Sequence, residues 1–299
     1  RLIAEGRVIP DQARHLRRSG FDGVVVGVGA DIDAWRRMDA AFSATYQPVE
    51  DSAVPIWRRR NPAPRNLEAV IGTLSRDTHN GDAAAILRTA LNSSLGLKPA
   101  VLSSFGAEAG VLLSLVARID PSTPVIFLDT GMHFLQTLAY RKALSERLGL
   151  TDVRLVTPDA DERADLDPRD DLWRADPDAC CDLRKVRPLE RALAGIDTLI
   201  TGRKAYQTPE RRGLRPFELF EGRIRVNPLH DWSEERLAAW FDAEDLPPHP
   251  LSAHGYRSIG CWPCTQAVEA GKDGRLGRWS GAAKTECGIH LGRRALPVG

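Results

Sequence analysis

The sequence predicts an α/β protein built on a doubly wound, mostly parallel sheet. From about residue 67 onward, short apolar strands alternate with amphipathic helices, which is the pattern of consecutive right-handed crossover units. The strands are apolar along most of their length, as expected when helices cover both faces of a sheet. A chain of 299 residues that is 42% hydrophobic can bury a sizeable core. We therefore expect one large domain with smaller additions.

The elements expected in the large domain are strands of four to six residues and longer helices with apolar residues at helical spacing. In chain order they are a helix over 82–98, a strand over 99–104, a helix over 108–119, a strand over 124–129, a helix over 134–150, a strand over 152–157, a helix over 185–196 and a strand over 197–202.

The first 46 residues predict a small α/β appendage of unknown role. A polar helix is expected over 11–20, a Val-rich strand over 21–29 and a helix over 31–46 with Trp35, Met38 and Phe42 on one side. The turn "GVGAD" has a Gly-x-Gly but no third glycine, so a plain strand-to-helix turn is favoured over a nucleotide loop. A Pro-rich linker is expected over 47–66.

Charge and hydropathy exclude several classes of protein. The net charge of +1 disfavours nucleic-acid binding, whereas the basic stretches after residue 180 suit a small anionic substrate. No apolar run approaches the roughly 20 residues of a membrane span, and the first residues do not resemble a signal peptide. A cytoplasmic protein without a membrane partner is expected.

Three strands end in polar loops, and such loops meet at the carboxyl edge of a parallel sheet, where ligands bind. The small-residue turn "SSFGAEAG" (103–110) suits an anion at a helix start, and it lacks the Lys-Ser/Thr ending of a Walker loop. The loop "FLDTGMHF" (127–134) suits a ribose or base edge, and "TGRKAYQTPERRG" (201–213) carries cations. The residues singled out are Ser103, Ser104, Phe105, Gly106, Asp129, Thr130, Gly131, Arg203 and Lys204.

The five cysteines indicate a metal centre with one thiol left over. Two pairs, Cys180-Cys181 and Cys261-Trp-Pro-Cys264, precede the single Cys287. Disulfides are disfavoured in the cytoplasm, and four thiolates suit either zinc or an iron–sulfur cluster. Adjacent residues on a helix diverge by about 100°, so a bulky cluster fits Cys180 and Cys181 more easily than a single ion does.

The combination of "SSFGAEAG", "LDTG", "CCDLRKVRPLERAL", "GCWPCT", "GRW" and "KTECGIH" resembles the assimilatory adenylyl-sulfate (APS) reductases, relatives of the phosphoadenylyl-sulfate (PAPS) reductases, over about residues 67–292. The resemblance implies a sheet of the adenine-nucleotide alpha-hydrolase-like type, a nucleotide-binding reductase domain over 67–260, and a segment over 261–299 with the Cys-x-x-Cys pair and a mobile catalytic tail. It also implies one 4Fe-4S cluster on Cys180, Cys181, Cys261 and Cys264. Residues 1–46 resemble the end of a small uncharacterised domain found beside sulfate-assimilation enzymes.

By the same resemblance, Cys287 is the nucleophile that attacks the sulfate sulfur of APS, expels AMP and becomes an S-sulfocysteine. A thiolate next to cations is the soft nucleophile that this chemistry needs. Lys185, Arg203, Arg275 and Arg278 match positions that bind the phosphosulfate, and His290 is a candidate for orienting the tail. No thioredoxin-like domain follows Gly292, so a separate thioredoxin or glutaredoxin is the expected reductant. A homo-oligomer is also expected.

Three alternatives remain open at this point. A PAPS reductase needs an extra basic pocket for the 3′-phosphate, for which Arg211, Arg212 and Arg215 are candidates. An ATP-dependent thiolation enzyme of the PP-loop type normally has Ser-Gly-Gly-x-Asp-Ser, and "SSFGAEAG" lacks the Asp-Ser. A non-catalytic, metal-stabilised nucleotide-binding module leaves Cys287 without a role.

Overall fold

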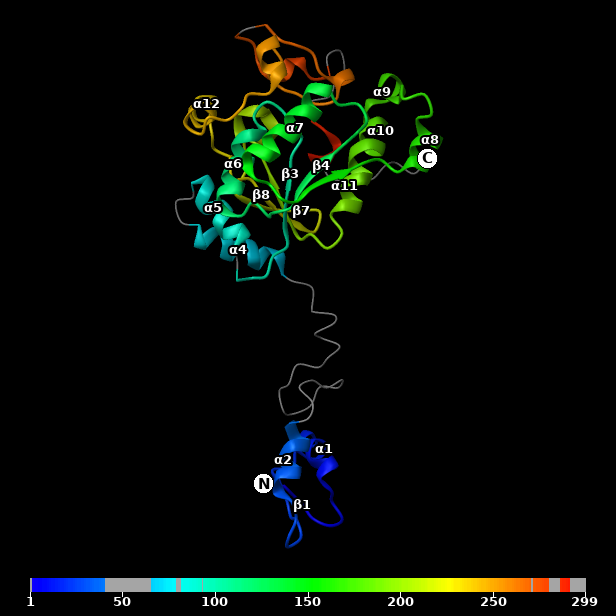
Figure 1. The fold of residues 1–299 in the computed structure, drawn as a ribbon, viewed down its shortest axis with the longest axis vertical. Helices are drawn as coiled ribbons and strands as arrows, with labels where there is room; N and C mark the ends of the chain where they lie inside the picture. The colour runs from blue at the N-terminus through cyan, green and yellow to red at the C-terminus, as the bar shows by residue number, and fades with distance from the viewer. Residues whose placement is uncertain are drawn as a thin grey trace. The chain divides into compact units, whose positions relative to one another are not determined.

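The computed structural model describes residues 2–40, 66–78, 82–92, 94–269, 271–279 and 286–290. The chain divides into two compact units, Arg1–Asn66 and Leu67–Gly299 (Figure 1). The linker predicted at 47–66 lies outside the described residues, apart from Asn66.

The first unit is a minimal α/β arrangement. Strand β1 (Ile3–Ala4) pairs in parallel with β2 (Gly23–Val24), and a short 3₁₀ helix, η1 (Pro10–Gln12), leads into α1 (Ala13–Arg18) between them. Helix α2 (Ile32–Ala40) follows and buries Trp35. The predicted strand and both helices are confirmed, β1 was not predicted, and the part of the last helix expected at 41–46 lies outside the described residues.

The second unit is built on a six-stranded sheet with the order β5-β4-β3-β6-β8-β7. All neighbouring strands are parallel except β7 and β8, so the predicted doubly wound, mostly parallel sheet is confirmed. The chain runs outward from β3 through β4 to β5 and then returns to β6 on the other side of β3, which makes the β3–β6 boundary the topological switch point. The strands are β3 (Pro99–Leu102), β4 (Val125–Leu128), β5 (Val153–Val156), β6 (Thr198–Thr201), β7 (Phe217–Phe220) and β8 (Arg223–Val226).

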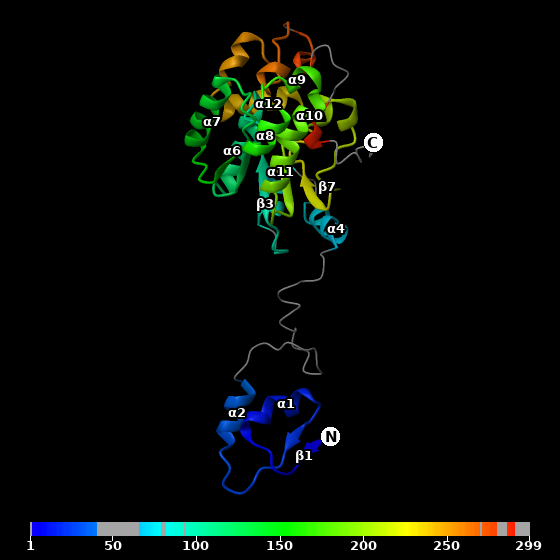
Figure 2. The same cartoon turned by 90° about the vertical axis from the view of Figure 1, so that its right-hand side faces the viewer.

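Helices cover both faces of this sheet because successive strand residues point to opposite sides. Val101 and Ile200 belong to the core beneath α4 (Leu67–Asp77), α5 (Ala83–Leu91), α6 (Ala109–Ile119), α7 (Leu135–Leu148) and α12 (Glu234–Ala243). Their neighbours Ala100 and Leu199 face α11 (Arg187–Ala192) instead. Figure 2 shows α6 and α7 on one side of β3 and α11 on the other.

The acidic stretch between β5 and α11 forms three short helices, α8 (Ala160–Leu166), α9 (Leu172–Ala175) and α10 (Pro177–Cys181). Some of its carboxylates are helix caps: Asp159 accepts backbone N–H groups at the start of α8, and Asp176 does so for α10. A π-helical turn, Asp182–Val186, then connects α10 to α11. Such turns widen a helix by one residue and are frequent at functional sites.

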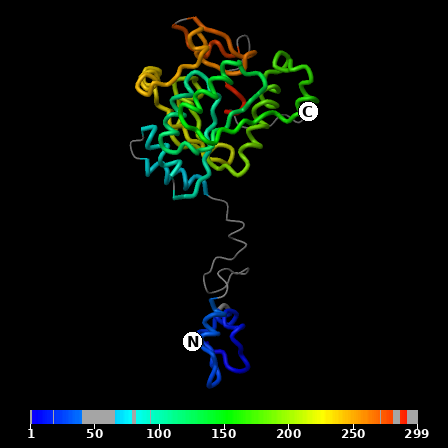
Figure 3. Tube along the Cα trace, in the orientation of Figure 1, coloured from blue at the N-terminus to red at the C-terminus, as the bar shows by residue number. Residues whose placement is uncertain are grey.

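Several short 3₁₀ helices lie in the segments after β6. They are η3 (Ala205–Gln207), η4 (Pro209–Arg211), η5 (Pro250–His254), η6 (Trp262–Cys264), η7 (Gly274–Gly277) and η8 (Gly288–His290). After Trp279, the structure describes Glu286–His290 of the tail that was predicted to be mobile. Within this stretch, η8 packs against the π-helical turn (Figure 3). No helix in the described ranges is both long and apolar enough to span a bilayer.

Candidate active site

A pocket of about 740 Å³ opens at the carboxyl ends of β3 and β6, at the switch point of the sheet. This volume suits a nucleotide-sized ligand. Its walls come from the loops after these two strands, from the segment around Tyr256–Gly260, and from the described tail. The predicted site residues that line it are Ser103, Ser104, Gly106, Lys185, Arg203, Arg275, Arg278, Cys287 and His290.

The loop after β3 brings small groups close to the pocket. Phe105 has a positive φ of 47°, and its ring packs edge-on against Phe127 in the core, so it does not line the pocket. Ser103 Oγ accepts the backbone N–H of Phe105. A Cβ at Gly106 would lie 3.1 Å from the carbonyl oxygen of Ile259, so glycine permits the close approach of these two segments.

The loop after β4 reaches both the cysteines and the pocket, because Leu128 and His133 line the pocket. Asp129, Thr130 and Gly131 all lie outside the pocket lining. The hydroxyl of Thr130 is 3.2 Å from Cys261 Sγ, and Asp129 Oδ1 accepts the N–H of Gly131. The ribose-binding role expected for these three residues stays a prediction.

The two cysteine pairs, which are about 80 residues apart in the sequence, come together in the fold. Cys180 packs with Cys261, while Cys181 packs in a second cluster with Cys264 and Cys287. All five thiols are free of disulfides, and burial raises the pKa of Cys180 to about 11. Within the described residues, no three His, Cys, Asp or Glu side chains are placed as ligands of a metal ion. Four thiols in two contacting groups suit either zinc or an iron–sulfur cluster.

Lys185 connects this thiol region to the pocket. It lies on the π-helical turn, four residues after Cys181, and lines the pocket. Burial alone would lower the pKa of Lys185, but negative charge on Cys261, Cys287 and Cys181 raises it well above its usual range. The ammonium group is therefore a fixed cation between the thiols and the pocket.

Cys287 is buried, with 8% of its surface exposed, and it lines the same pocket. A hydrogen bond with Cys181 lowers the pKa of the Cys287 thiol well below its usual range; burial opposes this effect, and the charges of Lys185 and Arg278 add to it. Arg278 donates from Nε to the carbonyl oxygen of Cys264 and lies over the ring of Trp279. A Cβ at Gly260 would collide with the Arg278 guanidinium, so this glycine makes room for it.

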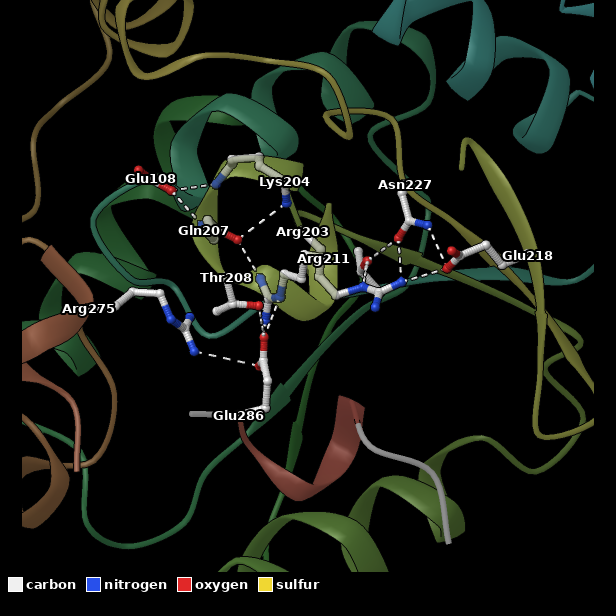
Figure 4. Close-up of polar contacts among 11 residues, drawn as sticks. Glu108, Arg203, Lys204, Gln207, Thr208, Arg211, Glu218, Asn227, Arg275 and Glu286 are labelled. Atoms are coloured by element: carbon white, nitrogen blue, oxygen red, sulfur yellow. Dashed lines mark hydrogen bonds and ion pairs between the residues drawn. The ribbon is translucent and has the colours of Figure 1, made fainter. Parts of the chain in front are cut away.

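The loop after β6 forms a connected set of ion pairs around the pocket (Figure 4). Lys204, which is buried, donates to Glu108 at the start of α6, and Tyr206 and Gln207 donate to the same carboxylate. Arg203 pairs with Glu218 at 2.8 Å and donates to Asn227. The cations of this loop are thus held in place by carboxylates of the main body.

Arg211 and the tail form a second buried ion pair. The Arg211 guanidinium donates to both oxygens of Glu286, over 2.5 and 2.7 Å, and Arg275 lies 3.6 Å from the same carboxylate (Figure 4). Arg212 and Arg215 are exposed and do not line the pocket. Of the three arginines considered for a 3′-phosphate, Arg211 alone lines the pocket, and its guanidinium is paired with a carboxylate.

His290 lies close to the same cations. Burial lowers the pKa of His290 well below its usual range, and the charges of Arg211, Arg203, Arg225 and Arg275 lower it further. A neutral imidazole is therefore expected at this position, and the role of His290 in orienting the tail stays a prediction.

Three residues of this region were not singled out from the sequence: Arg184, Glu108 and Glu286. Arg184 is 2% exposed and joins three segments, because it donates to Asp167, Asp170 and the carbonyl oxygen of Thr130. The partners lie 14 to 54 residues away in sequence, so no local pattern marks them. For Glu286, the sequence offers one signal of a functional role: it directly precedes the candidate nucleophile Cys287.

Comparisons with known proteins identify the family of this chain. Residues 98–267 match the model of the phosphoadenosine phosphosulfate reductase domain, and residues 1–57 match a bacterial protein family of unknown function, DUF934. An adenosine 5′-phosphosulfate reductase from Chelativorans sp. (strain BNC1) is 46% identical over 233 residues, which cover 76% of this chain and 94% of the relative. One from Mesorhizobium japonicum is 50% identical over 192 residues, which cover 64% of this chain and 76% of the relative.

Among solved structures, phosphoadenylyl-sulfate reductase from Candida auris, crystallised as a phosphate complex, matches with a TM-score of 0.57 and 26% identity over 66% of this chain and 96% of that one. Sequence motifs, sheet order and relatives lead to the same conclusion: this chain belongs to the phosphoadenosine phosphosulfate reductase domain family.

Proposed function

We propose that this chain is an oxidoreductase that reduces adenosine 5′-phosphosulfate to sulfite and AMP in assimilatory sulfate reduction. The observation that carries the proposal is the position of Cys287. Its buried thiol lines a nucleotide-sized pocket at the switch point of the sheet, and the cations Lys185 and Arg278 line the same pocket. A thiolate held among cations is a nucleophile suited to an anionic sulfate ester.

The reaction proceeds in two steps. The Cys287 thiolate forms a bond to the sulfate sulfur, the bond from sulfur to the phosphate oxygen breaks, and AMP leaves with the electron pair. The enzyme then carries an S-sulfocysteine. A thiolate of a thioredoxin-type partner attacks Cys287 Sγ, releases sulfite and forms a mixed disulfide, which the partner's second thiol resolves. The partner dithiol is oxidised by two electrons, and the sulfur of the substrate is reduced by two.

Cations around the pocket stabilise the charge that develops on the leaving phosphate. Lys185, Arg203, Arg275 and Arg278 all line it. The names of the relatives support APS as the substrate. The pairing of Arg211 with Glu286 and the exposure of Arg212 and Arg215 also disfavour a separate basic pocket for a 3′-phosphate.

We further propose that Cys180, Cys181, Cys261 and Cys264 hold one 4Fe-4S cluster, which when bound supplies a structural tie between the two pairs and a local charge near Lys185. Arg184 supports this arrangement because it fixes the π-helical turn to the carbonyl oxygen of Thr130, whose hydroxyl contacts Cys261. Five free thiols also suit the reducing cytoplasm.

The test is the intact mass of the anaerobic protein after mixing with APS or PAPS without reductant. We expect a mass increase of one sulfonate group with APS, absent from Cys287→Ser, and loss of that group with release of sulfite when thioredoxin is added. An increase with PAPS alone would keep the chemistry but refute the substrate. Iron-loaded protein that gains no mass with either nucleotide would refute the covalent mechanism.

A further inference from the structure

Glu286 occupies a site built for a carboxylate. It is 4% exposed, and both of its oxygens accept hydrogen bonds from the Arg211 guanidinium. Thr208 Oγ1 is 3.2 Å from Oε1, and Arg275 lies 3.6 Å from Oε2. Bidentate hydrogen bonds of this kind fix both the position and the orientation of a carboxylate.

The site that receives Glu286 is rigidly connected to the main body. Arg211 also donates to Gln207 Oε1, and Gln207 donates from Nε2 to Glu108 at the start of α6. The backbone N–H of Lys204 donates to Gln207 Oε1, which fixes the orientation of this amide. Figure 4 shows the resulting chain from Glu108 through Gln207 and Arg211 to Glu286. We call the ion pair between Glu286 and Arg211 the anchor of the tail. It is thus connected by hydrogen bonds to the loops after β3 and β6, which form the pocket.

Anchoring Glu286 also places the next residue. Consecutive Cα atoms are about 3.8 Å apart, so a fixed Glu286 leaves Cys287 little freedom to move away from the pocket. The Cys287 carbonyl oxygen accepts the N–H of His290 over 2.9 Å, which closes the short turn η8 against the π-helical turn. Between these two attachments, Cys287 packs with Cys181 and Trp279 and lines the pocket together with Lys185.

We propose that Glu286 is a positioning residue: its ion pair with Arg211 holds the tail in the closed arrangement that presents the Cys287 thiol to the substrate. The proposal rests on the proposed role of Cys287 as nucleophile. In the closed arrangement Cys287 is 8% exposed, too little for a protein dithiol to reach, so the ion pair must open before the second step. Weakening the anchor therefore slows the first step and leaves the second unimpaired.

The experiment compares Glu286→Gln with wild type and with Glu210→Gln. Glu210 is an exposed carboxylate that stands next to Arg211 in the loop after β6 and does not line the pocket, so its variant controls for loss of one nearby charge. In single-turnover reactions at saturating APS, we expect sulfonation of Cys287 to slow by about 100-fold in Glu286→Gln, as misplacement by roughly 1 Å does elsewhere. Release of sulfite by thioredoxin from the pre-sulfonated variant should be as fast as in wild type or faster.

A second readout does not depend on the reaction. Without substrate, alkylation of Cys287 by iodoacetamide, followed on the peptide that contains it, should be about tenfold faster in Glu286→Gln and in Arg211→Lys than in wild type, and unchanged in Glu210→Gln. Arg211→Lys keeps the positive charge but loses the bidentate hydrogen bonds to Glu286. The double variant Glu286→Gln/Arg211→Lys should be no faster than either single variant, because both remove one interaction.

The outcomes separate the two proposals. Wild-type protein that gains no sulfonate from APS or PAPS refutes the proposed function, while faster alkylation of Glu286→Gln would still support the anchor. Wild-type protein that is sulfonated, together with Glu286→Gln that reacts and alkylates at the wild-type rate, refutes the anchor and leaves the function standing. Circular dichroism and iron content equal to those of wild type establish that the variants are folded.

Discussion

Replacement of Arg184 by Met should destabilise the second unit strongly. Arg184 is 2% exposed and Asp167 is fully buried, and two hydrogen bonds of 3.2 and 2.6 Å join them. Removing the guanidinium leaves a buried carboxylate without its cation, which costs about 3–5 kcal/mol. With a urea dependence of about 2.5 kcal/mol per M, the midpoint of urea unfolding should fall by about 1.5 M.

The matched control is Arg187→Met, three residues further along. Arg187 pairs with Asp182 over 2.7 Å, but both side chains are 41% exposed, and such surface pairs contribute about 0–1 kcal/mol. Urea unfolding followed by tryptophan fluorescence, on iron-loaded protein under anaerobic conditions, measures both variants. If Arg184→Met and Arg187→Met shift the midpoint equally, burial does not govern the strength of these ion pairs and the reasoning fails.

Three further predictions concern the site and its surroundings. Gly260→Ala should displace the Arg278 guanidinium and lower kcat/KM for APS by about tenfold, equivalent to about 1.4 kcal/mol, with little change in the urea midpoint; steady-state kinetics would contradict this if kcat/KM were unaltered. Burial lowers the pKa of His249 to about 4, so this side chain is neutral in the folded protein, and the free energy of unfolding should fall by at most about 3 kcal/mol as the pH drops from 6.5 to 4. The fall should be smaller in His249→Asn, and equal slopes for the two proteins would exclude His249 as its source. Cys261→Ser should lose its iron while Cys287→Ser keeps it, as measured by iron content per chain; equal iron in both would remove Cys261 from the ligand set.

Much of the fold follows from local sequence pattern. The strands β3, β4, β5 and β6 lie inside the predicted ranges; β4 and β6 are buried along their whole length, whereas the edge strand β5 is recognisable although it carries the exposed Arg154. The β7–β8 hairpin was missed although "FELFEGRIRV" alternates in polarity, and its turn at Glu221–Gly222 has positive φ at both residues. That is the backbone of a type I′ turn, so the signal was present in the sequence.

The site was predictable to the extent that topology determines it. The loops after β3 and β6 meet because Leu102 pairs with Thr201 at the ends of adjacent strands. The loop after β4, the strand next to β3, also reaches the pocket through Leu128 and His133, whereas the ribose-binding role expected for Asp129 stays a prediction. Pairs such as Arg211 with Glu286, 75 residues apart, depend on the path of the tail, which no periodicity or spacing describes.

The π-helical turn at Asp182–Val186 has a consequence for how this segment can vary in length. A π turn is an α-helix with one residue added, and each residue of a helix advances the chain by about 100°. Deletion of Leu183 would restore a regular helix and leave α10 and α11 close to their present orientations, but it would remove the wide turn on which Arg184 and Lys185 lie. A change of length in this segment is therefore expected to act on the positions of Arg184 and Lys185 more than on the relative orientation of α10 and α11.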